Sequence, residues 1–343
     1  MSAEGYYRYP TIFKDQIVFV SEDDLWVISS GGGVARRLTS GLGSISTPVF
    51  SPDGEQLAFA GSEEGYPEVY IMPSKGGPIK RLTFLGEEVN VITWTEEGII
   101  FASSAGQPFS RWNALWCVSP HGGEPQRLPI GPANFISFKE KGSKVAVIQR
   151  HGYREYGFWK RYRGGTAGQL WIDQSGKGDF KNLLELGSDF ARPLWLQNRI
   201  YFSSDHEGVG NLYSCLADGT DIKQHTNHSD YYVRDQSTDG NRIVYHAGGD
   251  IYLFDPQENI TQKVTFDYHS AKFQRNRKFI TPVRYLEDFS IHPKGHHLAV
   301  VTRGKALAFG NWEGAVFQLG AQQGVRFRIP RWLHDGERVL LVH

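Results

Sequence analysis

The sequence predicts an all-β fold, a six-bladed β-propeller of four-stranded antiparallel blades followed by a truncated second propeller. Three observations support this: an aromatic strand core recurs, turn residues separate short β-rich runs, and no long helical pattern occurs. The recurring cores begin at Leu25, Val69, Leu115, Leu170, Leu212 and Ile251. Successive starts differ by 44, 46, 55, 42 and 39 residues, and a four-stranded blade takes about 40–50 residues.

Each repeat contains four short strands, and residues 47–84 show them most clearly. The expected strands are 47–50, 56–60, 68–72 and 80–83. Pro52, Asp53 and Gly54 supply a tight turn, because proline restricts φ and glycine accepts positive φ. Six such blades fit residues 8–266, which argues against a doubly wound α/β fold.

Ring closure depends on what the first and last blades contain. Blade one has its own four strands within residues 9–39, and blade six has its own within 231–266. No terminal strand is left over to latch the ring. We therefore expect apolar packing between blades one and six to close it, at the weakest point of the ring.

The blade pattern lapses and then resumes near the end of the chain. We predict a propeller at residues 1–266, a polar and basic linker at 267–281, and at 282–343 the first one to two blades of a second, incomplete propeller. Because about one and a half blades cannot close a ring, this last part is expected to be the least stable.

The composition restricts the partners. The chain has 37 lysine plus arginine residues and 37 aspartate plus glutamate residues, so its formal net charge is zero. No overall electrostatic field therefore attracts nucleic acid or an anionic membrane. Only two cysteines occur, and there is no signal-peptide core and no run of about 18 apolar residues. We predict a cytoplasmic protein that binds neither nucleic acid nor membrane.

The motifs of common active sites are missing. The chain has no GxSxG, HExxH, P-loop or GxGxxG pattern, so we predict no catalytic residues within it. Two histidine groups, at 225 and 228 and at 292, 296 and 297, lack cysteine or carboxylate partners at ligand spacing. We therefore predict no metal and no cofactor.

Basic residues occur in the outer strands of the first two blades. Arg36 and Arg37 lie in blade one, and Lys80 and Arg81 lie in blade two. We expect these to be solvated edge charges that discourage pairing between molecules.

A basic and aromatic segment at residues 150–163 lengthens blade four. Its candidate peptide-binding or interface residues are Arg154, Trp159, Lys160, Arg161, Tyr162 and Arg163. Guanidinium groups and rings could hold peptide carboxylates, or could stack on single-stranded nucleic acid. The segment could equally be a hairpin that packs against a neighbouring domain or subunit, where these residue types are also enriched.

Several stretches carry a family resemblance. The PDG turn and the KRLT outer strand resemble TolB-like propellers. More specific are residues 105–110 (AGQPFS), 158–172 (FWKRYRGGTAGQLWI), 230–232 (DYY) and 287–290 (EDFS). Together they resemble the N-terminal region of the tricorn protease family, and the resemblance covers the whole chain.

The resemblance implies a large cytoplasmic serine peptidase with a six-bladed propeller, a seven-bladed propeller, and C-terminal catalytic domains with a PDZ-like module between them. Such enzymes assemble as homo-hexamers and degrade peptides released by the proteasome or similar proteases. The six-bladed propeller is associated with product exit, and a basic pair near the end of blade two with binding the substrate carboxylate. Here residues 85–89 read LGEEV, which departs from that pattern.

The resemblance thus implies a region that gates or scaffolds peptide passage for a tricorn-type peptidase. Its partners would be peptides, its own catalytic domains and like subunits. The catalytic residues would lie beyond residue 343, so the fragment alone would be inactive. The alternative is a free-standing TolB-like protein–protein binding module. A prolyl-oligopeptidase-like propeller is disfavoured by the new blade pattern after residue 282.

Overall fold

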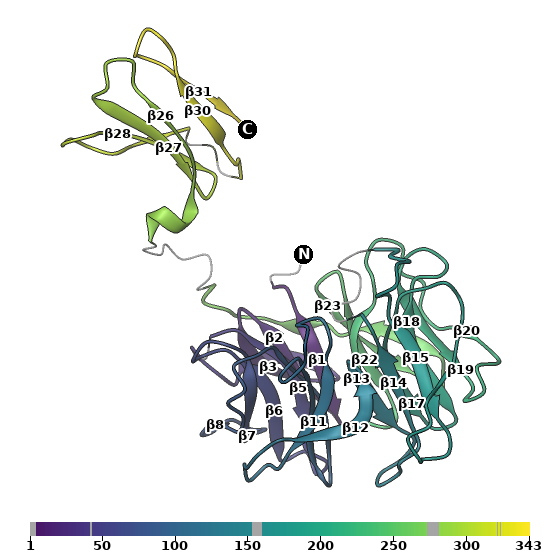
Figure 1. Cartoon of the computed structure of the whole chain (residues 1–343). Helices are drawn as coiled ribbons and strands as arrows, with labels where there is room; N and C mark the ends of the chain where they lie inside the picture. Colours follow the sequence, from purple (N-terminus) through teal and green to yellow (C-terminus); the bar gives the residue numbers. More distant parts are fainter. Residues whose placement is uncertain (1–4, 42, 153–159, 273–280, 321, 323) are drawn as a thin grey trace. The chain divides into compact units, whose positions relative to one another are not determined.

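The computed structural model describes the chain except residues 1–4, 42, 153–159, 273–280, 321 and 323. It divides into two compact units, Met1–Phe273 and Gln274–His343 (Figure 1). The described residues form strands and one short 3-10 helix, η2 (Pro282–Tyr285), which confirms the all-β prediction. No helix in this part of the chain is long and apolar enough to cross a membrane.

The first unit contains six four-stranded antiparallel blades, as predicted. Blade one comprises β1 (Arg8–Phe13), β2 (Gln16–Ser21), β3 (Asp24–Ser29) and β4 (Gly32–Arg37). Blade two comprises β5 (Ile45–Phe50), β6 (Gln56–Gly61), β7 (Glu68–Pro73) and β8 (Lys80–Arg81). Blade three comprises β9 (Val89–Thr95), β10 (Gly98–Ser103), β11 (Ala114–Val118) and β12 (Gln126–Pro132).

The other three blades repeat this order. Blade four comprises β13 (Phe135–Phe138), β14 (Ala146–Arg150), β15 (Gln169–Asp173) and β16 (Lys181–Asn182). Blade five comprises β17 (Phe190–Leu196), β18 (Arg199–Ser204), β19 (Asn211–Cys215) and β20 (Lys223–Gln224). Blade six comprises β21 (Arg234–Thr238), β22 (Ile243–Ala247), β23 (Asp250–Asp255) and β24 (Ile260–Lys263).

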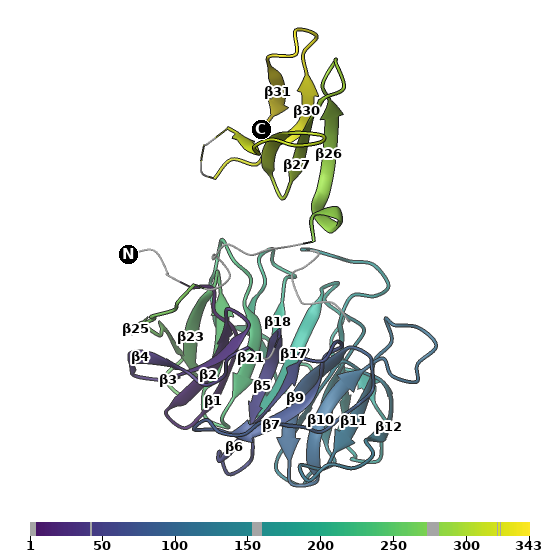
Figure 2. The same ribbon diagram turned by 90° about the vertical axis from the view of Figure 1, so that its left-hand side faces the viewer.

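Within each blade the chain runs from the middle of the unit to its edge. Figure 2 shows β5, β9, β17 and β21 in the middle of the first unit, with β4 and β12 at its sides. The second and third strands of the blades carry the most buried side chains, because neighbouring blades cover both of their faces. The short outer strands are largely exposed.

The PDG turn of blade two forms as expected. Asp53 Oδ1 accepts hydrogen bonds from Ser51 Oγ at 2.6 Å and from the Glu55 amide at 3.0 Å. Gly54 has a φ of 79°, and an added Cβ would lie 2.1 Å from the Phe13 ring. Both the left-handed backbone and the close approach of blade one therefore require glycine here.

The prediction of solvated edge charges is wrong for the second basic residue of each outer strand, Arg37 and Arg81. Arg37 pairs with Asp24, a buried carboxylate at the start of β3. Asp24 Oδ1 also accepts from Thr39 Oγ1 at 2.8 Å, and Thr39 Oγ1 accepts from the Leu25 amide at 2.9 Å. The Arg-Leu-Thr motif thus binds the outer strand to the third strand.

Blade two repeats this arrangement with a different acid. Arg81 lies 3.2 Å from Glu68, and the Thr83 hydroxyl donates to Glu68 at 2.5 Å. Glu68 is buried, so leaving it without these partners would incur the cost of a buried unpaired charge. The motif therefore has a structural role that exposure alone does not reveal.

Ring closure differs from the expectation. A short strand, β25 (Phe266–Asp267), follows blade six and pairs in parallel with β4, through Gly33 and Val34. The expectation that no strand would be left over is therefore wrong. Gly32, with a φ of 94°, lets this strand approach, because an added Cβ would lie 2.5 Å from the Thr265 carbonyl oxygen.

The expected apolar packing between blades one and six is also present. A single core cluster contains Ile17 and Phe19 of blade one together with Val244 and Ile251 of blade six. Tyr268 closes the cluster: its ring centroid lies 4.7 Å from that of Trp26. Its hydroxyl forms a 2.9 Å hydrogen bond with Ser21 Oγ. The seam is thus held by packing, a short strand and buried hydrogen bonds.

The second unit contains one four-stranded sheet and one two-stranded sheet. The first sheet comprises β26 (Leu286–Ile291), β27 (His297–Thr302), β28 (Lys305–Gly310) and β29 (Phe317–Leu319), and the second comprises β30 (Arg328–Trp332) and β31 (Val339–Val342). Its buried core is small and centres on Val301, Ala306 and Phe327. Large apolar side chains stay exposed, including Phe289 at 52% and Ile291 at 57%.

Candidate functional site

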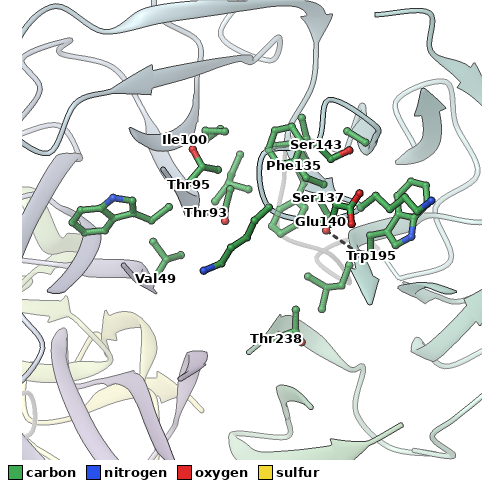
Figure 3. Close-up of a pocket in the computed structure, with 18 of the residues that line it drawn as sticks. Val49, Thr93, Thr95, Ile100, Phe135, Ser137, Glu140, Ser143, Trp195 and Thr238 are labelled. Carbon is green, nitrogen blue, oxygen red and sulfur yellow. Dashed lines mark hydrogen bonds between the residues drawn. The ribbon is translucent and has the colours of Figure 1, made fainter. Parts of the chain in front are cut away.

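The innermost strands of the first unit surround a cavity of about 870 Å³. Every blade contributes to its wall: Pro10 from β1, Val49 from β5, Thr93 from β9, Ser137 from β13, Trp195 from β17 and Thr238 from β21. Figure 3 shows that the side chains of this wall mix hydroxyl and apolar groups. The cavity is therefore the axial channel of the propeller.

Backbone bulges shape the channel wall. Four inner strands shift register and carry a non-glycine residue with positive φ: Tyr9, Thr47, Arg192 and Asp235. Such a bulge bends a strand and redirects its side chains. Left-handed backbone at non-glycine residues is strained, so neighbouring contacts must hold it in place.

Hydrogen bonds also join neighbouring inner strands along the wall, one of them through the bulge residue Thr47. Thr47 Oγ1 accepts from the Val91 amide at 3.0 Å. Ser137 Oγ accepts from the Trp195 amide at 2.8 Å (Figure 3). These bonds join blades two to three and four to five, so the wall is an ordered surface built from several blades.

A charged network joins blades five and six at the wall. Arg192 Nη2 lies 2.8 Å from Asp235 Oδ1, and His246 Nε2 lies 2.9 Å from Asp235 Oδ2. Burial alone would raise the pKa of the Asp235 carboxyl, but Arg192 and the His246 hydrogen bond outweigh it and hold this pKa below its usual value. Asp235 is therefore an anion that fixes Arg192 beside the channel.

The backbone around Arg192 is held on both sides. Its amide donates to Gln149 Oε1 at 2.9 Å, and its carbonyl accepts from Gln236 Nε2 at 2.9 Å. Its guanidinium carbon lies 5.5 Å from the centroid of the Phe135 ring. Among the described wall residues Arg192 is the single arginine, so the wall carries one pre-positioned guanidinium.

One mouth of the channel is charged. The turns at this end carry Glu96, Glu97 and Glu140 together with Lys139, Lys141, Lys144 and Lys177. Both signs are interspersed, which suits a polar peptide chain better than a ligand with one sign of charge. No histidine lies among the described wall residues, so the wall serines have no imidazole base beside them.

The basic segment of blade four contributes a different cluster. Of its predicted site residues, Arg154 and Trp159 lie outside the described residues. Arg163 Nη1 lies 2.8 Å from Asp205 Oδ1, and the Arg161 amide donates to Asp205 Oδ2 at 2.9 Å. Asp205 is buried at 1% exposure, so it anchors the end of the segment to blade five.

The segment and the charged mouth lie at opposite ends of the propeller. The segment follows β14, whereas the Lys139–Lys144 turn precedes that strand. Lys160, Arg161, Tyr162 and Arg163 are absent from the described channel wall. The structure therefore does not bring them together with the channel, and their proposed peptide or interface role stays a prediction.

Sequence reasoning missed Arg192, Asp235 and Asp205. A signal existed for Arg192, because it is the one charged residue in the otherwise apolar strand Phe190–Leu196, and charged residues are seldom placed in such strands without a partner. Asp205 and Asp235 lie in polar surroundings in the sequence and carried no comparable signal.

The fold and the channel define a class: β-propellers in which six blades present an ordered, mixed polar and apolar wall to an axial passage. Residues 4–260 match the family model described as the tricorn protease N-terminal beta propeller domain. The chain therefore belongs to the tricorn protease family.

Individual relatives agree with this assignment. The chain is 36% identical to the tricorn protease homolog of Saccharolobus solfataricus, with 97% of the chain and 31% of that protein covered. It is 35% identical to the tricorn protease of Thermoplasma acidophilum, with 87% of the chain and 28% of that protein covered. A crystal structure of the tricorn protease aligns with a TM-score of 0.82 at 31% identity, over 99% of the chain and 33% of that structure. The chain thus spans about a third of the length of these relatives.

Proposed function

We propose that this propeller guides and size-selects peptides through its axial channel for a tricorn-type serine peptidase whose catalytic residues lie in another part of the polypeptide. The observation that carries the proposal is the channel wall itself. Six blades contribute to it, bulges shape it, and a buried carboxylate fixes one guanidinium on it. A surface that merely fills space between blades requires none of these features.

The size and chemistry of the channel fit a peptide. A cavity of about 870 Å³ is in the range that accommodates small ligands and excludes a folded domain. Hydroxyl groups such as those of Thr93 and Thr238 offer hydrogen bonds to a peptide backbone, and Val49 and Trp195 offer apolar contact. The wall therefore suits an extended chain of mixed sequence.

Several finer statements belong to the same proposal. The first propeller covers residues 1–268, because the latch strand and Tyr268 belong to it, the chain up to residue 281 connects, and residues 282–343 begin a second propeller. The whole protein works in the cytoplasm on peptides, with its own catalytic domains and like subunits as partners. The basic segment that contains Arg163 contacts either a peptide or a neighbouring subunit.

The proposal is tested by closing the channel in the full-length peptidase that contains this propeller. Thr93→Cys and Thr238→Cys are introduced together in a Cys117→Ala background, since both threonines lie on the wall. A bis-maleimide then joins the two thiols. We expect hydrolysis of a fluorogenic tripeptide to fall several-fold, while the Thr93→Cys single variant treated with the same reagent keeps its rate. Unchanged hydrolysis in the crosslinked protein would overturn the proposal and favour a propeller that only binds other proteins.

A further inference from the structure

The cavity extends sideways from the axis, into the space between blades three and four. Its lining there consists of Ile100, Cys117, Leu128 and Ile130 from blade three, and Phe138 and Phe180 from blade four. We call this extension the side slot. It is continuous with the channel, because the same cavity also touches the inner strands of all six blades.

The side slot differs from the interface between blades one and two. Ile100 pairs in register with Cys117, and the matching pair in blade one is Val18 and Val27. Those two valines are buried against blade two at 0% and 9% exposure. By contrast, Cys117 is half-buried in the slot, so blade four does not cover this face of blade three as blade two covers blade one.

Apolar groups at partial exposure line most of the slot. Leu128, Ile130, Phe138 and Phe180 are all half-buried apolar side chains that pack against the main core. An apolar ligand group that covers this half-buried surface removes it from water, and this burial favours binding. Among the described lining residues, charged groups such as Glu97 and Lys139 lie in the turns at the mouth.

We propose that the side slot binds a bulky apolar side chain, such as phenylalanine or leucine, of a peptide that lies in the channel. This inference rests on the proposed function, because the channel supplies the peptide. The slot then makes the passage selective: a peptide with such a side chain is retained, and one with small polar side chains passes without this contact.

Cys117 provides a direct reporter of slot occupancy. Burial and the nearby Glu97 carboxylate raise the pKa of its thiol, so labelling is measured at about pH 8.5, where more thiolate is present. The second cysteine, Cys215, is fully buried, and its pKa is raised to about 12. A small thiol reagent such as monobromobimane will therefore report on Cys117.

The test compares two pentapeptides, Gly-Gly-Phe-Gly-Gly and Gly-Gly-Ser-Gly-Gly. Labelling of Cys117 is expected to slow about fourfold when the phenylalanine peptide is present at about three times its Kd. The serine peptide at the same concentration is expected to leave the rate unchanged. Cys117→Ser identifies any background reaction.

A filled slot provides the matched control. Ile130→Trp places a large ring in the slot, and Ile260→Trp makes the same change on the exposed outer strand of blade six. The phenylalanine peptide is expected to lose its protective effect in Ile130→Trp and to keep it in Ile260→Trp. Persistent protection in Ile130→Trp would overturn the proposal.

The outcomes also separate this inference from the proposed function. Equal protection by both peptides would remove the slot's selectivity while leaving a channel that binds peptides. No protection by either peptide would overturn the slot, and the crosslinking assay would then decide the channel's role independently. Protection by the phenylalanine peptide alone, lost in Ile130→Trp, would support the proposal.

Discussion

Arg192 on β17 and Asp235 on β21 form an ion pair between blades five and six, with 2.8 Å between Nη2 and Oδ1. Both residues have positive φ, at 48° and 51°, so each lies on the bulge of its strand. Asp235 is 4% exposed and Arg192 is 25% exposed. The buried acid therefore positions the more accessible base at the channel wall.

Replacing the acid of this pair should destabilise the ring. Asp235→Asn keeps a residue that tolerates positive φ but leaves Arg192 without its counter-charge. We expect the free energy of unfolding in urea to fall by about 3 kcal/mol near neutral pH. The ion pair of Arg199 with Asp221 is the control: the Asp221 side chain is 43% exposed, so Asp221→Asn is expected to have a much smaller effect.

The pH dependence of Asp235→Asn follows from the lowered pKa of this carboxyl. A depressed pKa in the folded state contributes stability above the unfolded-state value of about 4, and this contribution is lost as the pH falls through the folded pKa. The difference between parent and variant is therefore expected to shrink in acid. A difference that stays constant down to about pH 2 would contradict this account.

Two adjacent glycines test the closure of the ring. Gly32 and Gly33 both have positive φ, at 94° and 106°, but only at Gly32 would a Cβ meet the Thr265 carbonyl, at 2.5 Å. We expect the strain of a left-handed backbone to lower the free energy of unfolding of both alanine variants by about 1 kcal/mol. Gly32→Ala is expected to lose more stability and to increase amide exchange in β25 and β4. Identical exchange in the two variants would contradict a role for β25 in closure.

Asp189 is expected to make the propeller more stable in mild acid. Burial, opposed by the Gly168 amide and reinforced by Asp205, raises the pKa of this carboxyl to about 6. Between about pH 4 and 6 the unfolded chain loses this proton while the folded chain keeps it, so the free energy of unfolding falls as the pH rises. Above about pH 6 the folded protein carries the full cost of ionising the buried Asp189 carboxyl.

Asp189→Asn removes this titration and keeps an oxygen that can accept from the Gly168 amide, now 2.7 Å from Oδ1. The free energy of unfolding of the variant is expected to exceed that of the unsubstituted chain by about 1–3 kcal/mol near pH 8 and to equal it near pH 4. Urea unfolding at the two pH values measures this. Asp179→Asn, at an exposed position of blade four, is expected to show no such crossover.

The second unit is expected to exchange amide hydrogen faster than the first. Its sheets expose Phe289, Ile291 and Phe317, and its buried core is small. Little buried apolar surface lowers the free energy of local opening. Hydrogen exchange of this 343-residue chain is expected to show weaker protection in β26–β31 than in β2, β6 and β18. Equal protection would show that the second unit is stabilised by more than its own core.

Local sequence patterns predicted most of the first unit. Strand cores such as Leu25-Trp26-Val27 and turns such as the one at Asp53 depend on residues within one blade, and both formed as expected. The latch strand Phe266–Asp267 did not show in the sequence, because it is two residues long and its partner lies more than 200 residues earlier. Long-range pairing of so short a segment has no local pattern.

The candidate site was harder to predict than the fold. Arg37 resembled an exposed edge charge until the structure placed it on the buried Asp24, and the ion pair of Arg163 with Asp205 was not apparent from the sequence. Arg163 and Asp205 lie 42 residues apart in different blades, so spacing within one blade carries no signal for this pair. Charge pairing across strands and blades is decided by register, which the sequence of one strand does not specify.

The sequence by itself determined the repeat, the four-stranded blades and the family, because each depends on short patterns that recur along the chain. Only the tertiary structure decided which side chains meet: Arg192 with Asp235 at the channel, β25 with β4 at the seam, and the incomplete cover of Cys117 by blade four. The physical reason is that a propeller's strands pair locally within a blade, whereas its channel, seam and slots lie between blades and depend on how the blades pack.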